Sequence, residues 1–169
     1  MKLKKFSYKK VLSTNDIAIK KIKKGFENGI ILADEQKKGR GKYGSKWISI
    51  KGNLFTTIFF KINKKIKLKK ILKFNCGLVK KTLKQVLKKN INIKSPNDIM
   101  INKEKVSGIL QEIINYKNNK YLIVGIGINI VASPKIDNYK CSHINNFHNK
   151  FISRNKVFYL LKDMYEKNL

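Results

Sequence analysis

The chain has 169 residues, enough for one domain with a sizeable hydrophobic core. It contains no apolar run near the roughly 18 residues of a membrane-spanning helix, and its lysine-rich start is not followed by the apolar segment of a signal peptide. A membrane protein and a secreted protein are therefore not expected. We predict a single domain over residues 1–169, located in the cytoplasm, with free thiols at Cys76 and Cys141.

The charge is strongly basic, with 39 Lys and Arg, 10 Asp and Glu, and a formal net charge of +29. Such a charge is typical of nucleic-acid-binding proteins. However, Arg40 and Arg154 are the only arginines, and arginine makes the bidentate base and phosphate contacts on which such proteins rely. The lysines are spread over every predicted element. The charge therefore predicts attraction of acidic partners rather than specific binding of nucleic acid.

The N-terminal part predicts two strands with a helix between them. Residues 6–11 alternate weakly between polar and apolar side chains, and residues 30–33 form a short apolar run. Between them, four successive capping residues at 13–16 precede an apolar stripe of helical period. Glycines at positions 25 and 29 are expected to end this helix. The simplest interpretation of Ser13 and Thr14 is that they cap it.

A glycine-rich loop over residues 36–47 separates the strand at 30–33 from a second apolar strand at 54–60. Its twelve residues include three glycines, five cations and the only tryptophan, Trp47. Glycines let a loop bend around an anion and present its backbone N–H groups, and the cations add positive charge. The loop is therefore predicted to bind a phosphate or carboxylate beside a heterocycle. The alternative is a mobile basic loop without a ligand.

Within this loop, Gly39-x-Gly41-x-x-Gly44 also matches the dinucleotide-binding fingerprint. That motif requires a helix to open at the third glycine and an acidic residue about twenty positions later. Here the chain runs on into a strand, and the region near residue 60 carries lysines instead. We therefore reject a dinucleotide site.

The middle of the chain predicts a helix and a series of strands. An apolar stripe over residues 69–89 predicts an amphipathic helix, and short strands follow at 91–93 and in a hairpin of 99–101 with 106–114. A further apolar strand spans residues 121–130. Its two glycines, at positions 125 and 127, imply that a ligand or another backbone approaches closely there.

The C-terminal part predicts a polar surface loop over residues 132–150 and an amphipathic helix over 154–167. Cys141, His143 and His148 resemble metal ligands, but they offer only three ligands, with no partner pair. We do not expect a metal there.

Six short motifs occur in order along residues 6–130, and together they carry a resemblance. They are Ser13-Thr14-Asn15, Gln36-x-x-Gly39-Arg40-Gly41-x-x-Gly44-x-x-Trp47, Gly52-Asn53-Leu54, Pro96-Asn97-Asp98, Lys105-Val106-Ser107-Gly108-Ile109-Leu110-x-Glu112 and Gly125-x-Gly127-Ile128-Asn129. In these motifs the chain resembles the catalytic domain of the biotin protein ligases, with near-family spacing. One such motif would be weak evidence, whereas the ordered set is specific.

The resemblance implies an α+β fold, a mixed sheet with helices packed on one side. It also implies a two-step reaction, in which the biotin carboxylate attacks the α-phosphate of ATP and a lysine of a biotin carboxyl carrier protein then opens the mixed anhydride. The substrates are then biotin and ATP, with Mg²⁺ to offset the repulsion between carboxylate and phosphates. The resemblance leaves the oligomeric state open between a monomer and a homodimer.

The resemblance also assigns site residues. Those assigned to biotin are Ser13, Thr14, Asn15, Gln36, Gly39, Arg40, Gly41, Lys42, Lys105 and Gly108, and those assigned to the nucleotide are Arg40, Lys42, Trp47, Asn97 and Asn129. Lys105 and Arg40 are the catalytic candidates, and Lys105 would hold the carboxylate and the α-phosphate together. Trp47 would stack on the adenine. Asp98 is a candidate for placing Mg²⁺, and other metal ligands stay unassigned.

The chain departs from the family pattern at several points. Lys42 and Ser95 stand where the family usually has an arginine and an aromatic residue. Lysine keeps the charge but lacks the planar fork of arginine, so looser retention of the adenylate is expected. No DNA-binding helix-turn-helix precedes Phe6, and no small SH3-like barrel follows the last helix. We therefore expect no repressor activity. In the family the barrel helps to enclose nucleotide and acceptor, so we expect less than full ligase activity.

Three alternatives stay open. A lipoate or octanoate ligase would share the fold and the adenylating lysine, but the histidine-bearing loop of that family has no match here. A basic nucleic-acid-binding protein would need its lysines clustered on one surface with aromatics between them. A degenerate, inactive remnant is disfavoured, because Arg40 persists in a chain that has lost nearly every other arginine.

Overall fold

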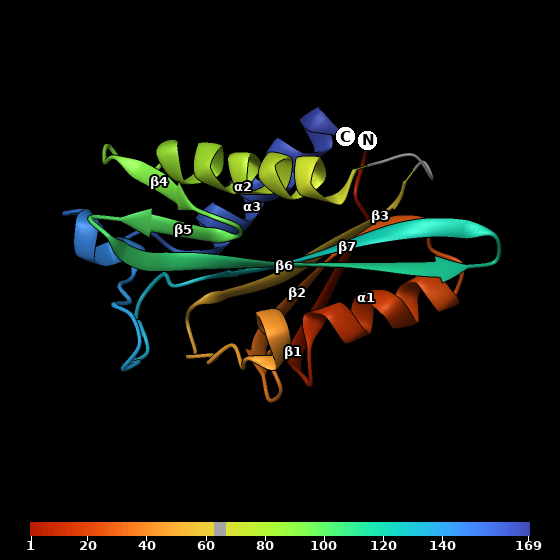
Figure 1. The fold of residues 1–169 in the computed structure, drawn as a ribbon, viewed down its shortest axis with the longest axis horizontal. Helices are drawn as coiled ribbons and strands as arrows, with labels where there is room; N and C mark the ends of the chain where they lie inside the picture. Colours follow the sequence, from red (N-terminus) through yellow and green to blue (C-terminus); the bar gives the residue numbers. More distant parts are fainter. Residues whose placement is uncertain (63–66) are drawn as a thin grey trace.

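The computed structural model describes residues 1–62 and 67–169. They form one mixed seven-stranded sheet with helices packed on it (Figure 1). The strands are β1 (Lys5–Val11), β2 (Asn28–Gln36), β3 (Leu54–Ile62), β4 (Ile91–Lys94), β5 (Asp98–Ile101), β6 (Glu104–Tyr116) and β7 (Asn119–Ile128), and the helices are α1 (Thr14–Lys23), α2 (Leu68–Lys84) and α3 (Arg154–Asn168), with 3₁₀ turns η1 (Lys42–Gly44) and η2 (Ile144–Phe147). No helix in these two ranges is long and apolar enough to cross a membrane.

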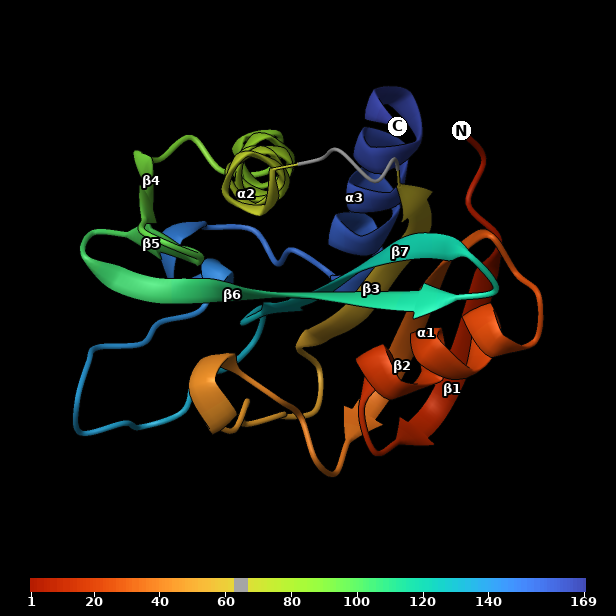
Figure 2. The ribbon, with the colours of Figure 1, turned by 45° about the vertical axis from the view of Figure 1, so that its right-hand side comes forward.

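The strand order across the sheet is β1-β2-β3-β7-β6-β5-β4. Strands β1 and β2 run parallel, and every other neighbouring pair is antiparallel. The predicted fold class, a mixed α/β sheet with helices, is confirmed. Strand β7 lies between β3 and β6, so segments far apart in the sequence meet at the centre of the sheet. The turned view in Figure 2 shows the same arrangement with α2 and α3 above the strands and α1 below.

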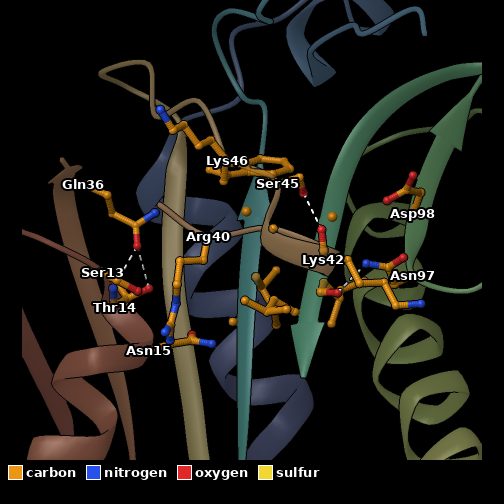
Figure 3. A pocket seen from close by; sticks show the side chains of 18 of the residues that line it. Ser13, Thr14, Asn15, Gln36, Arg40, Lys42, Ser45, Lys46, Asn97 and Asp98 are labelled. Atoms are coloured by element: carbon orange, nitrogen blue, oxygen red, sulfur yellow. Dashed lines mark hydrogen bonds between the residues drawn. The ribbon is translucent and has the colours of Figure 1, made fainter. Parts of the chain in front are cut away.

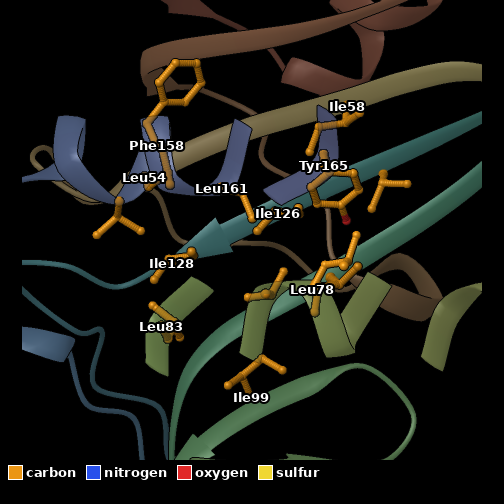
Figure 4. Close-up of a cluster of buried hydrophobic side chains, with 14 of the residues drawn as sticks. Leu54, Ile58, Leu78, Leu83, Ile99, Ile126, Ile128, Phe158, Leu161 and Tyr165 are labelled. Carbon is orange, nitrogen blue, oxygen red and sulfur yellow. The ribbon is translucent and has the colours of Figure 1, made fainter. Parts of the chain in front are cut away.

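The two faces of the sheet carry different cores. Alternate residues of one strand point to opposite faces, so Ile30 and Ile58 face the large cluster under α2 and α3, whereas Ile31 and Phe59 face a smaller cluster under α1. Figure 4 shows the larger cluster, in which Tyr165 of α3 is fully buried. The expectation that helices pack on one side is therefore wrong for α1. That helix buries Ala18 and Ile22 on the face opposite α2 and α3.

Two predicted boundaries differ from the structure. Helix α2 ends at Lys84 rather than near residue 89, because the N–H groups of Gln85 and Val86 bond to carbonyls three residues back and tighten the last turn. Val86 is still buried, so the apolar stripe continued past the helix. Gly29 does not end α1 but lies inside β2, where a Cβ atom would stand 2.8 Å from the ring of Phe59. Gly25, with a φ of 90°, follows the end of α1 as expected.

The predicted surface loop over residues 132–150 is partly wrong. Ile144 in η2 is fully buried in the large core, and Ser142 is also buried. The backbone of this segment is tied to the sheet, since the N–H of Ile144 donates to the carbonyl of Asn129 at 2.9 Å. The few scattered apolar residues of this polar stretch were too weak a signal to predict this packing.

Candidate functional site

A cavity of about 240 Å³ opens between the N-terminal end of α1, the glycine-rich loop, and the ends of β5, β6 and β7 (Figure 3). Most of the predicted site residues line it. Those in its wall are Ser13, Thr14, Asn15, Gln36, Arg40, Gly41, Lys42, Trp47, Asn97, Asp98, Lys105 and Gly108. The fold therefore gathers residues that span almost a hundred positions of sequence into one cavity.

At the α1 end of the cavity, the polar side chains do more than cap the helix. Ser13 stands at the N-cap position, but its side chain makes no capping hydrogen bond and lies buried in the cavity wall. The backbone N–H and the hydroxyl of Thr14 approach the side-chain oxygen of Gln36 at 2.8 and 3.0 Å. Capping alone therefore does not explain Ser13 and Thr14. They form, with Gln36, a buried polar surface suited to a neutral polar ring.

Thr57 of β3 is a site residue that the sequence analysis missed. It is fully buried, and its hydroxyl lies 2.8 Å from that of Thr14 and 2.6 Å from the side-chain oxygen of Asn15. It therefore fixes the α1 end of the cavity from below. The signal was present, since a threonine in a fully buried apolar strand needs a hydrogen-bond partner. Its neighbour Thr56 finds one in the carbonyl of Ile31, at 2.6 Å.

The glycine-rich loop is folded into a small hairpin. The N–H of Gly41 donates to the carbonyl of Ser45 at 2.7 Å, and that of Trp47 donates to Gly39 at 2.9 Å. At the tip, Tyr43 and Gly44 have φ angles of 51° and 76°, a conformation that favours glycine. These bonds fold the loop into a hairpin beside the cavity, while anion binding by the loop stays a prediction.

Arg40 is held above the cavity by two carboxylates. Its guanidinium lies 2.9 Å from Glu112 of β6 and 3.1 Å from Asp16 of α1. The arginine side chain is 41% exposed, so these ion pairs are partly screened by water. Arg40 therefore lies in the cavity wall as predicted, and its guanidinium is paired with two of the protein's own carboxylates.

The indole of Trp47 lies flat against two glycines of the sheet. A Cβ atom at Gly127 would collide with the ring, and one at Gly108 would lie 2.9 Å from it. Gly125 is similarly covered by the side chain of Asn15. The β7 glycines are closely approached, but by the side chains of Trp47 and Asn15 rather than by the predicted ligand or backbone. The indole N–H is buried and has no hydrogen-bond partner among the described residues.

Lys105 sits at the opposite end of the cavity from Thr14 and Gln36. Its side chain is 14% exposed, and its ammonium pairs with Asp98 at 2.9 Å. The ring of Trp47 lies 5.7 Å from this ammonium and that of Tyr139 lies 5.0 Å from it. Tyr139 belongs to the stretch expected to be a surface loop, and nothing in the sequence marked it as a wall residue. Aromatic faces on two sides stabilise a cation that is largely removed from water.

The backbone of Lys105 is tied to residues 140–142 by two hydrogen bonds. Its N–H donates to the carbonyl of Lys140 at 2.9 Å, and its carbonyl accepts from the N–H of Ser142 at 3.0 Å. Burial raises the pKa of the adjacent Cys141 thiol, which keeps the thiol neutral next to the ammonium. A lysine placed on such a rigid strand presents its charge at a fixed position.

Two predicted residues lie beside the main cavity rather than in its wall. Asn129 borders a small neighbouring cavity together with Trp47 and Lys105, and its side-chain oxygen is buried without a partner among the described residues. Gly39 is buried within the loop, where a Cβ atom would meet the carbonyl of Trp47 at 2.6 Å. The side chain of Asn97 lines the cavity and donates to the carbonyl of Ile109 at 2.7 Å.

Asp98 is the only carboxylate among the residues that form the cavity wall. A single carboxylate beside a polyphosphate is a common arrangement for Mg²⁺, which takes its other ligands from phosphates and water. Asp98 therefore fits that role.

Near Cys141, burial lowers the pKa of His143 and favours its neutral form. Within residues 1–62 and 67–169, no three His, Cys, Asp or Glu side chains gather as a metal site.

Comparison with known proteins gives a consistent result. The model of the biotin/lipoate A/B protein ligase family matches residues 8–129. The bifunctional ligase/repressor BirA of Escherichia coli is 29% identical over 124 residues, covering 70% of this chain and 38% of that protein. BirA of Bacillus subtilis is 30% identical over 111 residues, covering 64% of this chain and 34% of that protein. The chain thus spans little more than a third of these curated relatives.

The solved structures match this chain over a larger share of their own length than the curated relatives do. The biotin protein ligase of Aquifex aeolicus, in complex with biotin and ATP, superposes with a TM-score of 0.79 at 27% identity, over 98% of this chain and 69% of that one. The enzyme of Leishmania major, in complex with biotinyl-5-AMP, gives 0.77 at 28% identity, over 97% and 75%. A lipoate protein ligase from Thermoplasma acidophilum shares the fold, with a TM-score of 0.69 at 10% identity, over 99% and 83%.

Proposed function

The chain belongs to the biotin/lipoate A/B protein ligase family, and from this premise we propose that it is an ATP-dependent biotin protein ligase. It would form biotinyl-5′-AMP and pass the biotinyl group to a lysine of a biotin carboxyl carrier protein. The observation that carries this proposal is the cavity itself. One end holds the polar set of Thr14 and Gln36, the other holds the ammonium of Lys105, and a basic loop lies across the opening.

Recognition of biotin falls to the α1 end. The ureido ring of biotin is a neutral group with both donors and acceptors, and buried polar side chains select such a ring because a wrong ligand leaves them unpaired. Ser13, Thr14, Asn15 and Gln36 supply these groups, and Thr57 holds two of them in place from below. The carboxylate tail then points along the cavity toward Lys105.

The first step joins two anions. A carboxylate oxygen of biotin attacks the α-phosphorus of ATP, the bond to the bridging oxygen breaks, and pyrophosphate leaves with the electron pair. The Lys105 ammonium stabilises the charge that builds on the oxygens of the α-phosphate, because it is fixed in place and only 14% exposed. To do so, it must exchange its contact with Asp98 for the phosphate oxygens. Arg40 and Lys42 add charge from the loop side.

Asp98 would hold Mg²⁺ when the nucleotide is present, and the ion would offset the charge of the phosphates. The exchange of partners at Lys105 leaves this carboxylate free for that role. Trp47 would then cover the adenine ring from the loop, with Asn97 and Asn129 nearby.

In the second step, the neutral amine of the acceptor lysine attacks the carbonyl carbon of the adenylate. The acyl–phosphate bond breaks, AMP leaves, and the amine releases a proton to give the amide. The basic surface of the protein, with a net charge of +29, favours approach of an acidic acceptor domain.

The same chemistry on lipoate or octanoate is the second candidate function, and the shared fold of the Thermoplasma lipoate ligase favours including it. ATP–pyrophosphate exchange measured side by side with biotin, lipoate and octanoate tests both. We expect exchange that depends on biotin. Exchange only with the fatty acids would move the chain to the lipoate branch, and none with any of the three would reject the proposed function.

A further inference from the structure

One carboxylate links the two halves of the cavity. Glu112 lies on β6, where it is paired in register with Ile123 of the neighbouring strand. The same oxygen, Oε2, accepts a hydrogen bond from the side-chain amide of Asn15 and pairs with the guanidinium of Arg40 at 2.9 Å. Asn15 lies at the α1 end of the cavity and Arg40 in the glycine-rich loop, so Glu112 contacts both of these parts.

The contacts form a continuous chain. The hydroxyl of Thr57 meets both Thr14 and the oxygen of Asn15, and the amide nitrogen of Asn15 meets Glu112, which in turn holds Arg40. The amide of Asn15 is therefore fixed at both of its ends. The loop cation is tied through Glu112 to a central strand of the sheet rather than only to a neighbouring loop. Asp16 provides a second, more exposed anchor for Arg40.

We propose that Glu112 is a positioning residue that holds Arg40 over the cavity before any ligand arrives and fixes the Asn15 amide for the ring of the substrate. The assignment of that ring to biotin rests on the proposed function. The glycine-rich loop is then partly closed in the empty protein, and an incoming carboxylate or phosphate competes with Glu112 and Asp16 for the same guanidinium. The two roles differ chemically, since Asn15 needs only a hydrogen-bond acceptor, whereas Arg40 needs a negative charge.

The closing role is tested on the ligand-free protein by the fluorescence of Trp47, which is the only tryptophan and lies in this loop. In Glu112→Ala and Glu112→Gln, we expect red-shifted emission and a rise of about twofold in acrylamide quenching, because loss of the charge frees the loop and the indole leaves the sheet. Glu27→Gln is the matched control, since Glu27 pairs with Lys61 outside the cavity. Unchanged emission and quenching in both Glu112 variants would overturn the closing role.

The positioning role is tested by the kinetics of biotin-dependent pyrophosphate exchange. Glu112→Ala should raise the KM for biotin about tenfold, because the Asn15 amide loses its acceptor. Glu112→Gln keeps an acceptor and should leave that KM close to the wild-type value, while Trp47 still reports a loosened loop. An equal rise in KM for both variants, or none for either, would refute this separation of roles.

The fluorescence measurement and the exchange kinetics test the proposals independently. If the wild-type protein shows no exchange with biotin, the proposed function fails, but the fluorescence of Trp47 still decides whether Glu112 closes the loop. Thermal unfolding of each variant separates a loosened loop from a destabilised fold. Asp16→Asn gives a second test, with an expected fluorescence change of the same sign as that of Glu112→Gln and of smaller size. A larger change would assign the closing role to Asp16 instead.

Discussion

The two catalytic candidates, Lys105 and Arg40, are held in different ways. Lys105 stands on a strand, is 14% exposed, and has both its N–H and its carbonyl hydrogen-bonded to the backbone of residues 140–142. Arg40 stands in the hairpin of the glycine-rich loop and is 41% exposed, and its guanidinium is held by ion pairs to Asp16 and Glu112. One is fixed by the sheet, and the other is attached to it by contacts that a ligand can replace.

This difference matches the two tasks that the proposed reaction sets. Charge that develops on phosphorus oxygens is best stabilised by a group that stays in place during the step, and Lys105 need only exchange Asp98 for the phosphates when the nucleotide binds. Entry of substrates and retention of the adenylate, in contrast, require a group that can move and return. We therefore assign the chemical step to the Lys105 region and gating to the Arg40 region. The predictions below test this division, beginning with the largest expected effect.

Lys105→Ala should lower the rate of adenylate formation by about 10²-fold or more, which is typical of removing one charge-stabilising group at a reacting centre. The fold should survive, since the lysine is not part of the buried core and its ammonium pairs with Asp98 in the cavity wall. Pyrophosphate exchange and thermal unfolding measure the two effects. Lys105→Arg keeps the charge and should recover part of the rate. Wild-type exchange by a folded alanine variant would remove Lys105 from the mechanism.

Arg40→Gly should weaken retention of the intermediate more than it weakens binding of biotin. We expect adenylate release to rise about tenfold, because a charge-assisted contact to the ligand is lost while the α1 end is intact. Released adenylate is measured as biotinylation of bystander proteins. A variant that modifies only its acceptor, at an unchanged rate, would show that the loop is not a gate.

The sequence predicted the cavity wall better than it predicted the arrangement of the helices on the sheet. The strands and helices carried strong periodic patterns, and the motif residues fell at their ends, so most of the cavity wall was predicted. The placement of α1 on the face opposite α2 and α3 was not, because it depends on the strand order, in which β7 lies between β3 and β6. A pattern of apolar residues shows that a helix has a buried side, but not which face of the sheet covers it.

Residues of the site and core that the sequence analysis missed were missed for the same reason. Tyr139 and Ile144 lie in a polar stretch with no periodic signal, and only the packed fold shows one beside Lys105 and the other in the core. Glu112 was visible as part of a motif, but its contacts with Asn15 and Arg40 join residues that are 97 and 72 positions away. Such contacts are set by tertiary structure, so local sequence cannot show them.

Gly127→Ala should displace Trp47, because a Cβ atom would collide with its indole. We expect a rise of about fivefold in the KM for ATP and a smaller one for biotin, since the proposed role of the indole is to cover the adenine. Gly77→Ala is the matched control, because nothing lies within 4 Å of its ideal Cβ position in α2. That change should leave both KM values unaltered and stabilise the fold by about 0.5–1 kcal/mol. Equal KM values for Gly127→Ala and wild type would place Trp47 outside nucleotide binding.

Added salt should affect the ion pairs of Arg40 more than the contacts of Lys105, and this is the smallest of the expected effects. The ion pairs of Arg40 involve side chains that are 31–41% exposed, whereas Lys105 and Asp98 are 14% and 25% exposed. Screening acts mainly on exposed charges, so raising the salt concentration from about 0.05 M to about 0.5 M should increase quenching of Trp47 in the ligand-free protein. Single-turnover adenylation at saturating substrates should change by less than about twofold, because the Lys105 end is largely shielded from the added ions. A steep fall in that rate, with no change at Trp47, would reverse the roles of the two regions and make Lys105 the weakly held cation.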